Sequence, residues 1–256
     1  MIELFHWEPV GHSARVLICL HEVGVEFKSY YVDLLQFEHF SDAFLAMNPM
    51  GQVPVLRVDD VVMTESSLIN EYLAESYPEA GLAQLDALGW YQTQAWSKYA
   101  DYNLGSSLAT LGCRKCLVPR LRDMDEKELE KSIEAIPVPE RRAGWEVAAN
   151  DAYTDEMIGN SERKLSLVIG RMEKVLADAQ WLAGEQYSIA DIDTFAMMRS
   201  FPDLAPQIAN RNDAPATFDW LERIAARPAV EEALSKYARL DPGTAFAPGP
   251  EHSRWG

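Results

Sequence analysis

Three short stretches near the N-terminus carry side chains that can hold and activate a small polar ligand. The first is the start of an expected helix, where His12 and Ser13 follow Gly11. Backbone N–H groups point outward at a helix start and the helix dipole favours negative charge there. A thiol brought to this position would be partly ionised by that field and by a hydrogen bond from Ser13. Taken alone, a serine that only caps the helix is the commoner arrangement.

The second stretch is the run Asn48-Pro49-Met50-Gly51-Gln52-Val53-Pro54, at the mouth of an expected strand. Proline cannot donate a hydrogen bond to a sheet, so Pro54 needs a special setting. If the Val53–Pro54 bond is cis, the turn exposes the N–H and C=O of Val53 to a peptide ligand, which can then pair like an added strand. A trans proline at a sheet edge explains this run equally well when it is taken alone.

The third stretch is Thr64-Glu65-Ser66-Ser67, directly before another expected helix. Its backbone N–H groups and serine hydroxyls can receive a carboxylate, while Glu65 can pair with an ammonium group; helix capping is the simpler alternative. Together the three stretches supply, in chain order, a thiolate stabiliser, an edge for a peptide backbone and a receptor for an amino-acid head group. This combination matches the three chemical parts of γ-glutamyl-cysteinyl-glycine.

The elements that must position these stretches change character once along the 256 residues. Up to about residue 80, short apolar runs alternate with helical spacing in the order β-α-β-α-β-β-α, which predicts a small mixed sheet of the thioredoxin-like kind. Helical periodicity then dominates to about residue 240 and predicts an all-α bundle. The helices expected in this second part are 86–112, 124–135, 139–150, 154–178, 188–200 and 217–238, followed by an extended tail at 241–256.

Composition narrows the classes of function. Hydrophobic residues make up 48% of the chain, yet no apolar run has the roughly 20 residues that cross a bilayer, and the N-terminus lacks a basic leader, so a cytoplasmic protein is expected. With 23 basic against 40 acidic residues the net charge is −17, which argues against nucleic acid and membranes as partners. Cys19, Cys113 and Cys116 fit a reducing compartment, and no second Cys/His pair at zinc-like spacing predicts a metal site.

Four runs give the chain a resemblance to the glutathione S-transferase superfamily over nearly its whole length. They are N-P-x-G-Q-V-P-V-L at 48–56, E-S-S-L-I-N-E-Y-L at 65–73, S-I-A-D-I at 188–192 and A-R-P-A-V at 226–230. The resemblance implies a thioredoxin-like, glutathione-binding domain at 1–80 and an all-helical domain at 86–240. It also implies glutathione as co-substrate and assembly as a homodimer.

The resemblance further implies roles for single residues. Ser13 would stabilise the thiolate, and Val53 would pair with the cysteinyl unit. His12, beside Ser13, is a second catalytic candidate as an acid–base group; a plain helix-start residue is the alternative. The superfamily often places a histidine just before an S-D step to meet the glycine carboxylate. Phe40 stands there in this chain, so either His39 substitutes or a different group anchors the glycine. The residues expected to bind glutathione are therefore His39, Gln52, Val53, Pro54, Glu65 and Ser66, with Pro54 as a cis-proline.

A narrower resemblance concerns the segment 114–163, which is much longer than an ordinary interhelical loop of roughly 2–8 residues. Its acidic helix at 125–130, its I-P-V-P-E run at 136–140 and Trp145 are similar to the insertion of bacterial glutathione-dependent β-etherases of lignin breakdown. That group usually has Asn where this chain has His12. The resemblance implies cleavage of β-aryl ethers in lignin-derived aromatic ketones. A detoxifying transferase or dehalogenase, and a non-catalytic interaction protein with this fold, are the alternatives.

The first loop and the first long helix of the second part are rich in aromatic residues, which can form a slot for a hydrophobic aromatic electrophile. Bundle cores and dimer seams use aromatic residues too, so structural packing is the alternative. His12 and Tyr102 are the candidates for donating a hydrogen bond to a leaving phenolate. The residues expected in this second-substrate pocket are Trp7, Pro9, Val10, Tyr99 and Tyr102.

Overall fold

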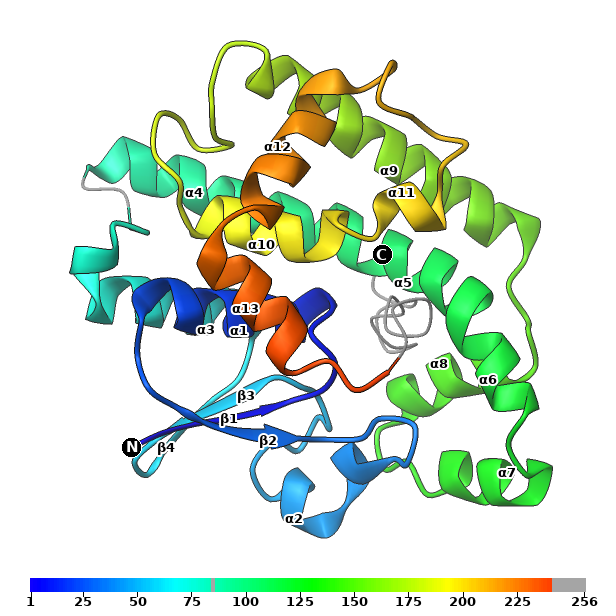
Figure 1. Cartoon of the computed structure of the whole chain (residues 1–256). Coiled ribbons are helices and arrows are strands. Elements are labelled where there is room, and N and C mark those ends of the chain that lie inside the picture. The colour runs from blue at the N-terminus through cyan, green and yellow to red at the C-terminus, as the bar shows by residue number, and fades with distance from the viewer. Residues whose placement is uncertain (84–85, 241–256) are drawn as a thin grey trace.

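The computed structural model of the chain describes residues 1–83 and 86–240 (Figure 1). Its first part is a four-stranded sheet of order β2-β1-β3-β4, in which β1 and β2 are parallel while β3 is antiparallel to both β1 and β4. The predicted order of strands and helices is confirmed. The elements of this part are β1 (Ile2–His6), α1 (Gly11–Val23), β2 (Lys28–Tyr31), η1 (Glu38–Phe40), α2 (Asp42–Leu45), β3 (Val55–Val58), β4 (Val61–Met63), α3 (Ser66–Ser76) and η2 (Pro78–Ala80), where η1 and η2 are 3₁₀ turns.

Apolar side chains pack the sheet against α1 and α3. Leu4 of β1, Leu56 of β3 and Leu17 of α1 have no exposed surface, and Leu73 of α3 is buried in the same core. Helix α1 ends at Gly24, whose φ of 68° is easily adopted only by a residue without a Cβ atom. The core thereby fixes the starts of α1 and α3, which carry two of the three site stretches.

The regular elements described in the second part are helices and helical turns, apart from an isolated β-bridge between Trp181 and Gly184. The first helix of this part runs without a break from residue 87 to 122, because two π-helical turns join α4, α5 and α6. The prediction that this helix ends at residue 112 is therefore wrong, and its last turns fall within the segment expected as an insertion. The elements are α4 (Ala87–Ala100), the π-turn η3 (Asp101–Gly105), α5 (Ser106–Gly112), the π-turn η4 (Cys113–Leu117), α6 (Val118–Arg122), α7 (Glu126–Glu134), α8 (Pro139–Ala149), α9 (Asp155–Leu176), α10 (Ile189–Met198), α11 (Phe201–Leu204), α12 (Pro215–Ala225) and α13 (Pro228–Lys236).

Helix α10 lies in the middle of the bundle and opens with a capping box. The Ser188 hydroxyl accepts from the N–H of Ala190 at 3.3 Å, and the Asp191 carboxylate accepts from the N–H of Ser188 at 3.2 Å. The same carboxylate accepts from the indole N–H of Trp220 on α12 at 2.9 Å. Burial raises the pKa of Asp191 to about 6, although these hydrogen bonds favour the charged form. The S-I-A-D run thus joins α10 to α12.

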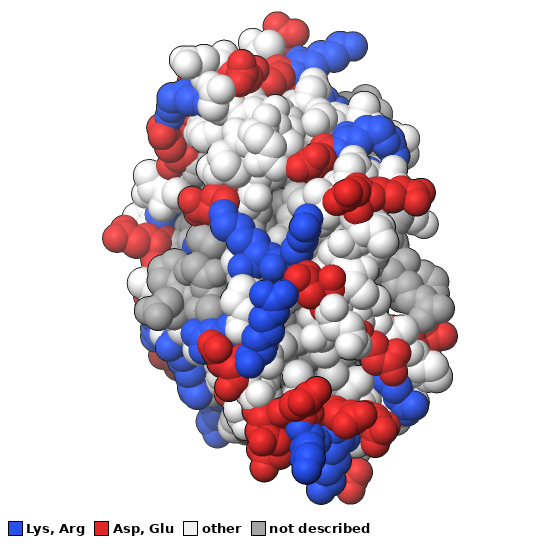
Figure 2. All heavy atoms as spheres, turned by 90° about the vertical axis from the view of Figure 1, so that its right-hand side faces the viewer, with Lys and Arg blue, Asp and Glu red and all other residues white. Residues whose placement is uncertain are grey.

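Helix α8 packs against the first part through aromatic contacts of Trp145. Trp145 of α8 is 1% exposed, and its ring centroid lies 4.6 Å from that of Phe37, just before η1. In Figure 1, α7 and α8 lie at the lower right. In Figure 2, acidic side chains gather at the lower end of the corresponding face around a few basic ones, and further basic side chains lie near its centre. The negative net charge is therefore unevenly spread over this face.

After α13, which packs along α1, the chain passes toward the loop between β1 and α1 (Figure 1). The tail expected at 241–256 lies outside the described residues. The described helices include none that is both long and apolar enough to cross a membrane.

Candidate active site

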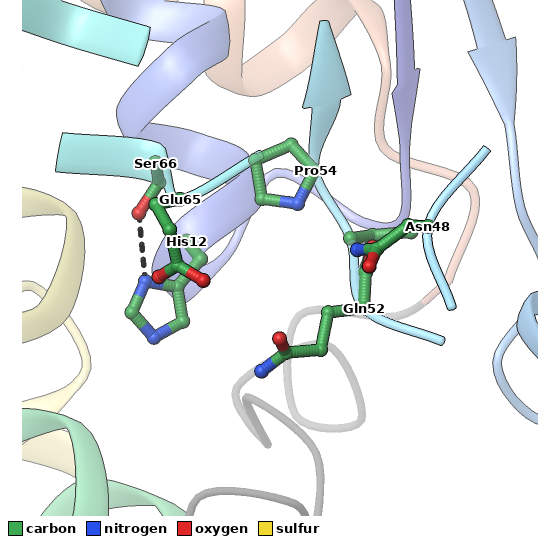
Figure 3. A pocket seen from close by; sticks show the side chains of 7 residues that line it. His12, Asn48, Gln52, Pro54, Glu65 and Ser66 are labelled. Carbon is green, nitrogen blue, oxygen red and sulfur yellow. Dashed lines mark hydrogen bonds between the residues drawn. The ribbon is translucent and has the colours of Figure 1, made fainter. Parts of the chain in front are cut away.

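A pocket opens where the starts of α1 and α3 meet the loop that leads into β3 (Figure 3). The three stretches singled out in the sequence come together here, although they are far apart in the chain. Six of the seven lining residues are among those expected in the site. The pocket is lined by His12, Asn48, Gln52, Val53, Pro54, Glu65 and Ser66.

The loop before β3 presents the backbone of Val53 at one side of this pocket. The Val53–Pro54 peptide bond is cis, the form that the resemblance implies. The Asn48 side chain closes the turn, since its Nδ2 donates to the C=O of Gln52 at 2.9 Å. Asn48 is buried, and sequence reasoning did not include it among the site residues. Its position at the head of the N-P-x-G-Q run was the available signal.

At the other side, the start of α3 and the start of α1 are hydrogen-bonded to each other. The Nδ1 atom of His12 lies 2.9 Å from Oγ of Ser66 (Figure 3). Glu65 precedes the helix with a φ of 66°, a left-handed conformation that is uncommon for a residue with a side chain. Backbone N–H groups and the helix dipole favour an anion at this end of α3. His12 therefore lies at the end of the pocket expected for the γ-glutamyl group.

Ser13 lies one residue further into α1 and does not line the described pocket. Its hydroxyl oxygen accepts from the backbone N–H of Trp7 at 3.2 Å, and the residue is 4% exposed. The N-cap of α1 is Val10, so Ser13 is not the cap of this helix. Because the Trp7 N–H occupies an acceptor position of Ser13 Oγ, the hydroxyl proton remains to be donated elsewhere.

Beneath the pocket, the guanidinium group of Arg15 connects α1 to α3 and to the helical part. Arg15 has no exposed surface; its Nη1 pairs with the Asp101 carboxylate and donates to Oγ of Ser66 at 3.4 Å. Its Nε donates to the C=O of Asp193 at 3.0 Å. Burial raises the pKa of Asp193 to about 6, and the charge of Arg15 opposes that rise. Asn70 donates to the Asp193 carboxylate at 2.8 Å.

The loop between β1 and α1 is held from two sides. Arg199, which follows α10, donates to the C=O of Pro9 at 3.1 Å. The fully buried carboxyl group of Glu8 accepts from the O–H of Tyr31 at 2.6 Å. Trp7 and Val10 of this loop are buried in a small apolar cluster that includes Val55 of β3. The indole N–H of Trp7 has no hydrogen-bond partner among the residues that the structure describes.

Two aromatic residues expected in the second-substrate pocket are not among those that line the described pocket. Tyr102 is 72% exposed on the surface. Tyr99 packs edge-on against Trp96 at 5.7 Å, with the guanidinium carbon of Arg171 only 4.1 Å from the centre of its ring. Structural packing, the alternative stated for these aromatic residues, therefore describes Tyr99 better than a place in the described pocket.

His39 is also away from the pocket, contrary to its expected place beside glutathione. It has no exposed surface, and its ring centroid lies 4.0 Å from that of Phe40 and 6.1 Å from that of Trp145. Phe40 in turn packs under Gly51, where an added Cβ would come within 2.5 Å of the Phe40 ring. His39 is thus part of the contact between the first part and α8.

Among the residues described, no group of three or more His, Cys, Asp or Glu side chains is placed to hold a metal ion. Cys113 and Cys116 form no disulfide and are buried in the π-turn η4.

Comparison with known proteins identifies the family that this fold and pocket define. Residues 11–76 match the N-terminal domain of glutathione S-transferases and residues 139–228 match the C-terminal domain. The chain belongs to the glutathione S-transferase family, whose members use glutathione as co-substrate.

Among its relatives is protein LigF of Sphingobium sp., 33% identical over 246 residues that cover 94% of this chain and 95% of LigF. The crystal structure of the β-etherase LigF superimposes with a TM-score of 0.86, covering 92% of this chain and 99% of the LigF chain. Glutathione S-transferase F13 of Arabidopsis thaliana is 26% identical over 254 residues, 96% of this chain and 98% of that protein.

Proposed function

We propose that this glutathione transferase cleaves β-aryl ether bonds in lignin-derived aromatic ketones. The observation that carries the proposal is the convergence of His12, Val53 and Ser66 on one pocket, next to a first loop whose apolar side chains suit an aryl group. Similarity to the β-etherase LigF over nearly the whole of both chains supports the choice of substrate class. The second substrate is a small, hydrophobic aromatic electrophile.

Each part of glutathione has a proposed receptor. The backbone of Val53 pairs with the cysteinyl unit beside Pro54 and Gln52, and the start of α3 with Glu65 and Ser66 holds the γ-glutamyl group. Since His12 is bonded to Ser66, we assign it to orienting this receptor. The Ser13 proton is directed to the glutathione sulfur and favours the thiolate over the thiol.

The reaction is a displacement at the carbon that bears the ether oxygen. The thiolate sulfur forms a bond to this carbon, the C–O bond breaks, and its electron pair leaves with the aryl oxygen as phenolate. The phenolate then takes a proton from water. The products are a glutathione thioether of the ketone and a phenol. The protein's tasks are to ionise the thiol, align the attack and stabilise the leaving oxygen.

The donor for the leaving oxygen is, in this proposal, the indole N–H of Trp7. Tyr102 is exposed and His12 is engaged with Ser66, whereas Trp7 lies in the loop whose backbone N–H bonds Ser13. A buried N–H without a partner costs about 1–3 kcal/mol, so a substrate oxygen that accepts from it is favoured. The donor acts most strongly as negative charge develops on that oxygen.

Phenol release from a racemic α-keto β-aryl ether, measured with and without glutathione, tests this function. Glutathione-dependent release supports it, and a stop at half conversion would show a preference for one enantiomer. Absence of release from protein that is retained on immobilised glutathione would direct the search to other electrophiles, such as organic halides. Absence of retention as well would favour the non-catalytic interaction protein.

We also propose that the enzyme acts in the cytoplasm as a homodimer. Exposed apolar side chains on the edge strand β4 and on α3 and α4 support the dimer, because such surface is usually covered by a partner. These side chains are Val61, Val62, Leu68, Leu88 and Tyr91. Sedimentation at two protein concentrations measures the oligomeric state directly.

A further inference from the structure

The chain segment after α13 is fixed to the first loop by a buried carboxyl group. Both carboxyl oxygens of Glu8 accept from the backbone N–H of Arg239, at 3.0 and 3.2 Å. Glu8 has no exposed surface, and a buried carboxyl group needs such donors because it has lost its water. The contact joins residues 231 positions apart and therefore determines where the end of the helical part lies.

Tyr31 completes this anchor. Its hydroxyl donates to Glu8 at 2.6 Å, and its ring lies 3.9 Å from the guanidinium carbon of Arg239. The cation thus packs on the face of the ring whose hydroxyl bonds the same carboxyl group. Burial and the neighbouring Glu8 raise the pKa of Tyr31, so the phenol keeps the proton it donates. One carboxyl group, one phenol and one guanidinium hold the segment in place.

Leu240, the residue after Arg239, connects this anchor to the site. Leu240 packs against the apolar cluster that contains Trp7 and Val10 of the first loop, and Val53 packs against the same cluster while also lining the glutathione pocket. The end of the helical part thus lies against the same apolar cluster as the first loop and the residue that bears the cysteinyl edge. In the proposed function this is where the aromatic group of the second substrate must lie.

We propose that Leu240, positioned by Glu8 and Tyr31 through Arg239, forms a wall of the second-substrate pocket and determines the size of the aromatic group that fits. This assignment rests on the proposed function for its substrate class. Arg239, Glu8 and Tyr31 are positioning residues, since they act on the substrate only through Leu240.

Two substitutions of opposite size test the wall. Leu240→Ala should raise kcat/KM for an α-keto β-aryl ether with a two-ring aryl group, relative to one with a single ring, by about tenfold. Leu240→Trp should shift the same ratio in the opposite direction. The KM for glutathione should change in neither variant. Lys236→Ala, an exposed position on α13, is the matched control and should leave the ratio unchanged.

The anchor is tested by Glu8→Gln and Tyr31→Phe. Both should reduce discrimination between the two ethers toward that of Leu240→Ala, because a released segment no longer holds the leucine in place. Where Glu8→Gln does not fold, Tyr31→Phe gives the same information. The proposal would be overturned if both Leu240 variants kept the wild-type ratio of kcat/KM for the two-ring ether to that for the one-ring ether. A change in this ratio that occurs only together with a change in the KM for glutathione would overturn it too.

A binding measurement separates this inference from the proposed reaction. S-benzylglutathione and S-(2-naphthylmethyl)glutathione present one and two rings without requiring any ether cleavage. In calorimetry, Leu240→Ala should favour binding of the two-ring conjugate over the one-ring conjugate. Leu240→Trp should have the opposite effect on the two dissociation constants. If the wild-type enzyme cleaves no ether yet these constants diverge, the wall stands and the reaction fails. If they do not diverge, the wall fails whatever the reaction.

Discussion

The Nδ1 atom of His12 lies 2.9 Å from the hydroxyl oxygen of Ser66, although 54 positions separate the two residues. Arg15 approaches the same hydroxyl from below at 3.4 Å and is held there by the Asp101 carboxylate. The serine expected to receive the γ-glutamyl group is thus oriented by one side chain at the pocket wall and one in the core. These two supports have different roles, which substitution can separate.

Replacing His12 should weaken glutathione binding more than it slows the chemical step. His12→Ala removes one hydrogen bond to Ser66, which is worth about 1 kcal/mol, so the KM for glutathione should rise about fivefold. Steady-state kinetics at saturating second substrate measures this. Glu75→Ala, at an exposed position of α3, is the control. A large loss of kcat at unchanged KM would instead place His12 in the chemical step.

Replacing Ser13 should raise the pKa of the bound thiol. A hydrogen bond to a charged acceptor is worth about 1.5–3 kcal/mol, so Ser13→Ala should raise that pKa by about one to two units. The thiolate absorbance of bound glutathione, followed against pH, gives the value. Ser132→Ala on α7 is the matched serine control. An unchanged thiol pKa would contradict the role assigned to Ser13.

The Arg15 ion pair should contribute far more to stability than an ion pair at the surface. Arg15→Ala leaves Asp101 and the fully buried Asp193 without their cation, which costs about 3–5 kcal/mol. Arg122→Ala is the control: its pair with Asp151 is 63% and 37% exposed, so its loss should cost under about 1 kcal/mol. Urea unfolding of both variants measures the difference, and similar losses would refute this ranking.

The free energy of unfolding should fall with rising pH over a range set by the raised pKa of Asp193. Burial raises its pKa to about 6 from the ordinary 3.8, so the folded protein holds this proton more tightly than the unfolded chain. Its contribution to stability is therefore present at the acid end and is lost as pH rises through about 6. Relative to Asp193→Asn, the wild type should lose at most about 3 kcal/mol between pH 4 and pH 6. Parallel urea midpoints across that range would contradict this.

Substitution by alanine should destabilise the protein more at Gly51 than at Gly24, although the two glycines have similar backbone angles. Gly24 and Gly51 have φ of 68° and 61°, but an added Cβ meets nothing within 4 Å at Gly24 and lies 2.5 Å from the Phe40 ring at Gly51. Gly24→Ala should cost about 1 kcal/mol of backbone strain. Gly51→Ala should cost about 1–3 kcal/mol more and raise the KM for glutathione. Equal unfolding free energies would show that the Phe40 ring yields freely.

The pocket residues were predictable because each stretch carries a local signal. The N-P-x-G-Q-V-P run and the E-S-S helix start indicate a turn and a helix start, and their combination with the start of the first helix pointed to one ligand. The S-I-A-D run is local in the same way, since its Ser188 and Asp191 form the capping box of α10. Hydrophobic periodicity likewise gave the order of the strands in the first part and most helices of the second.

The misplaced residues depend on features with no local signature. His39 faces inward because Phe37 adopts a φ of 57° and starts a 3₁₀ turn, which shifts the direction of the following side chains. The helix through residue 112 continues because a π-turn follows it, and π-turns have no sequence period of their own. The contact of Glu8 with Arg239 spans 231 positions and depends on the packing of α13 along α1.

The contact of Trp145 with His39 and Phe37 means that the sheet-containing half is not a detachable module. A fragment ending near residue 80 would expose to water two rings that the intact chain covers with a side chain from α8. Exchange of the helical half for that of another transferase would remove the same cover. The helix that carries Trp145 thereby makes the folding of the first part depend on the second.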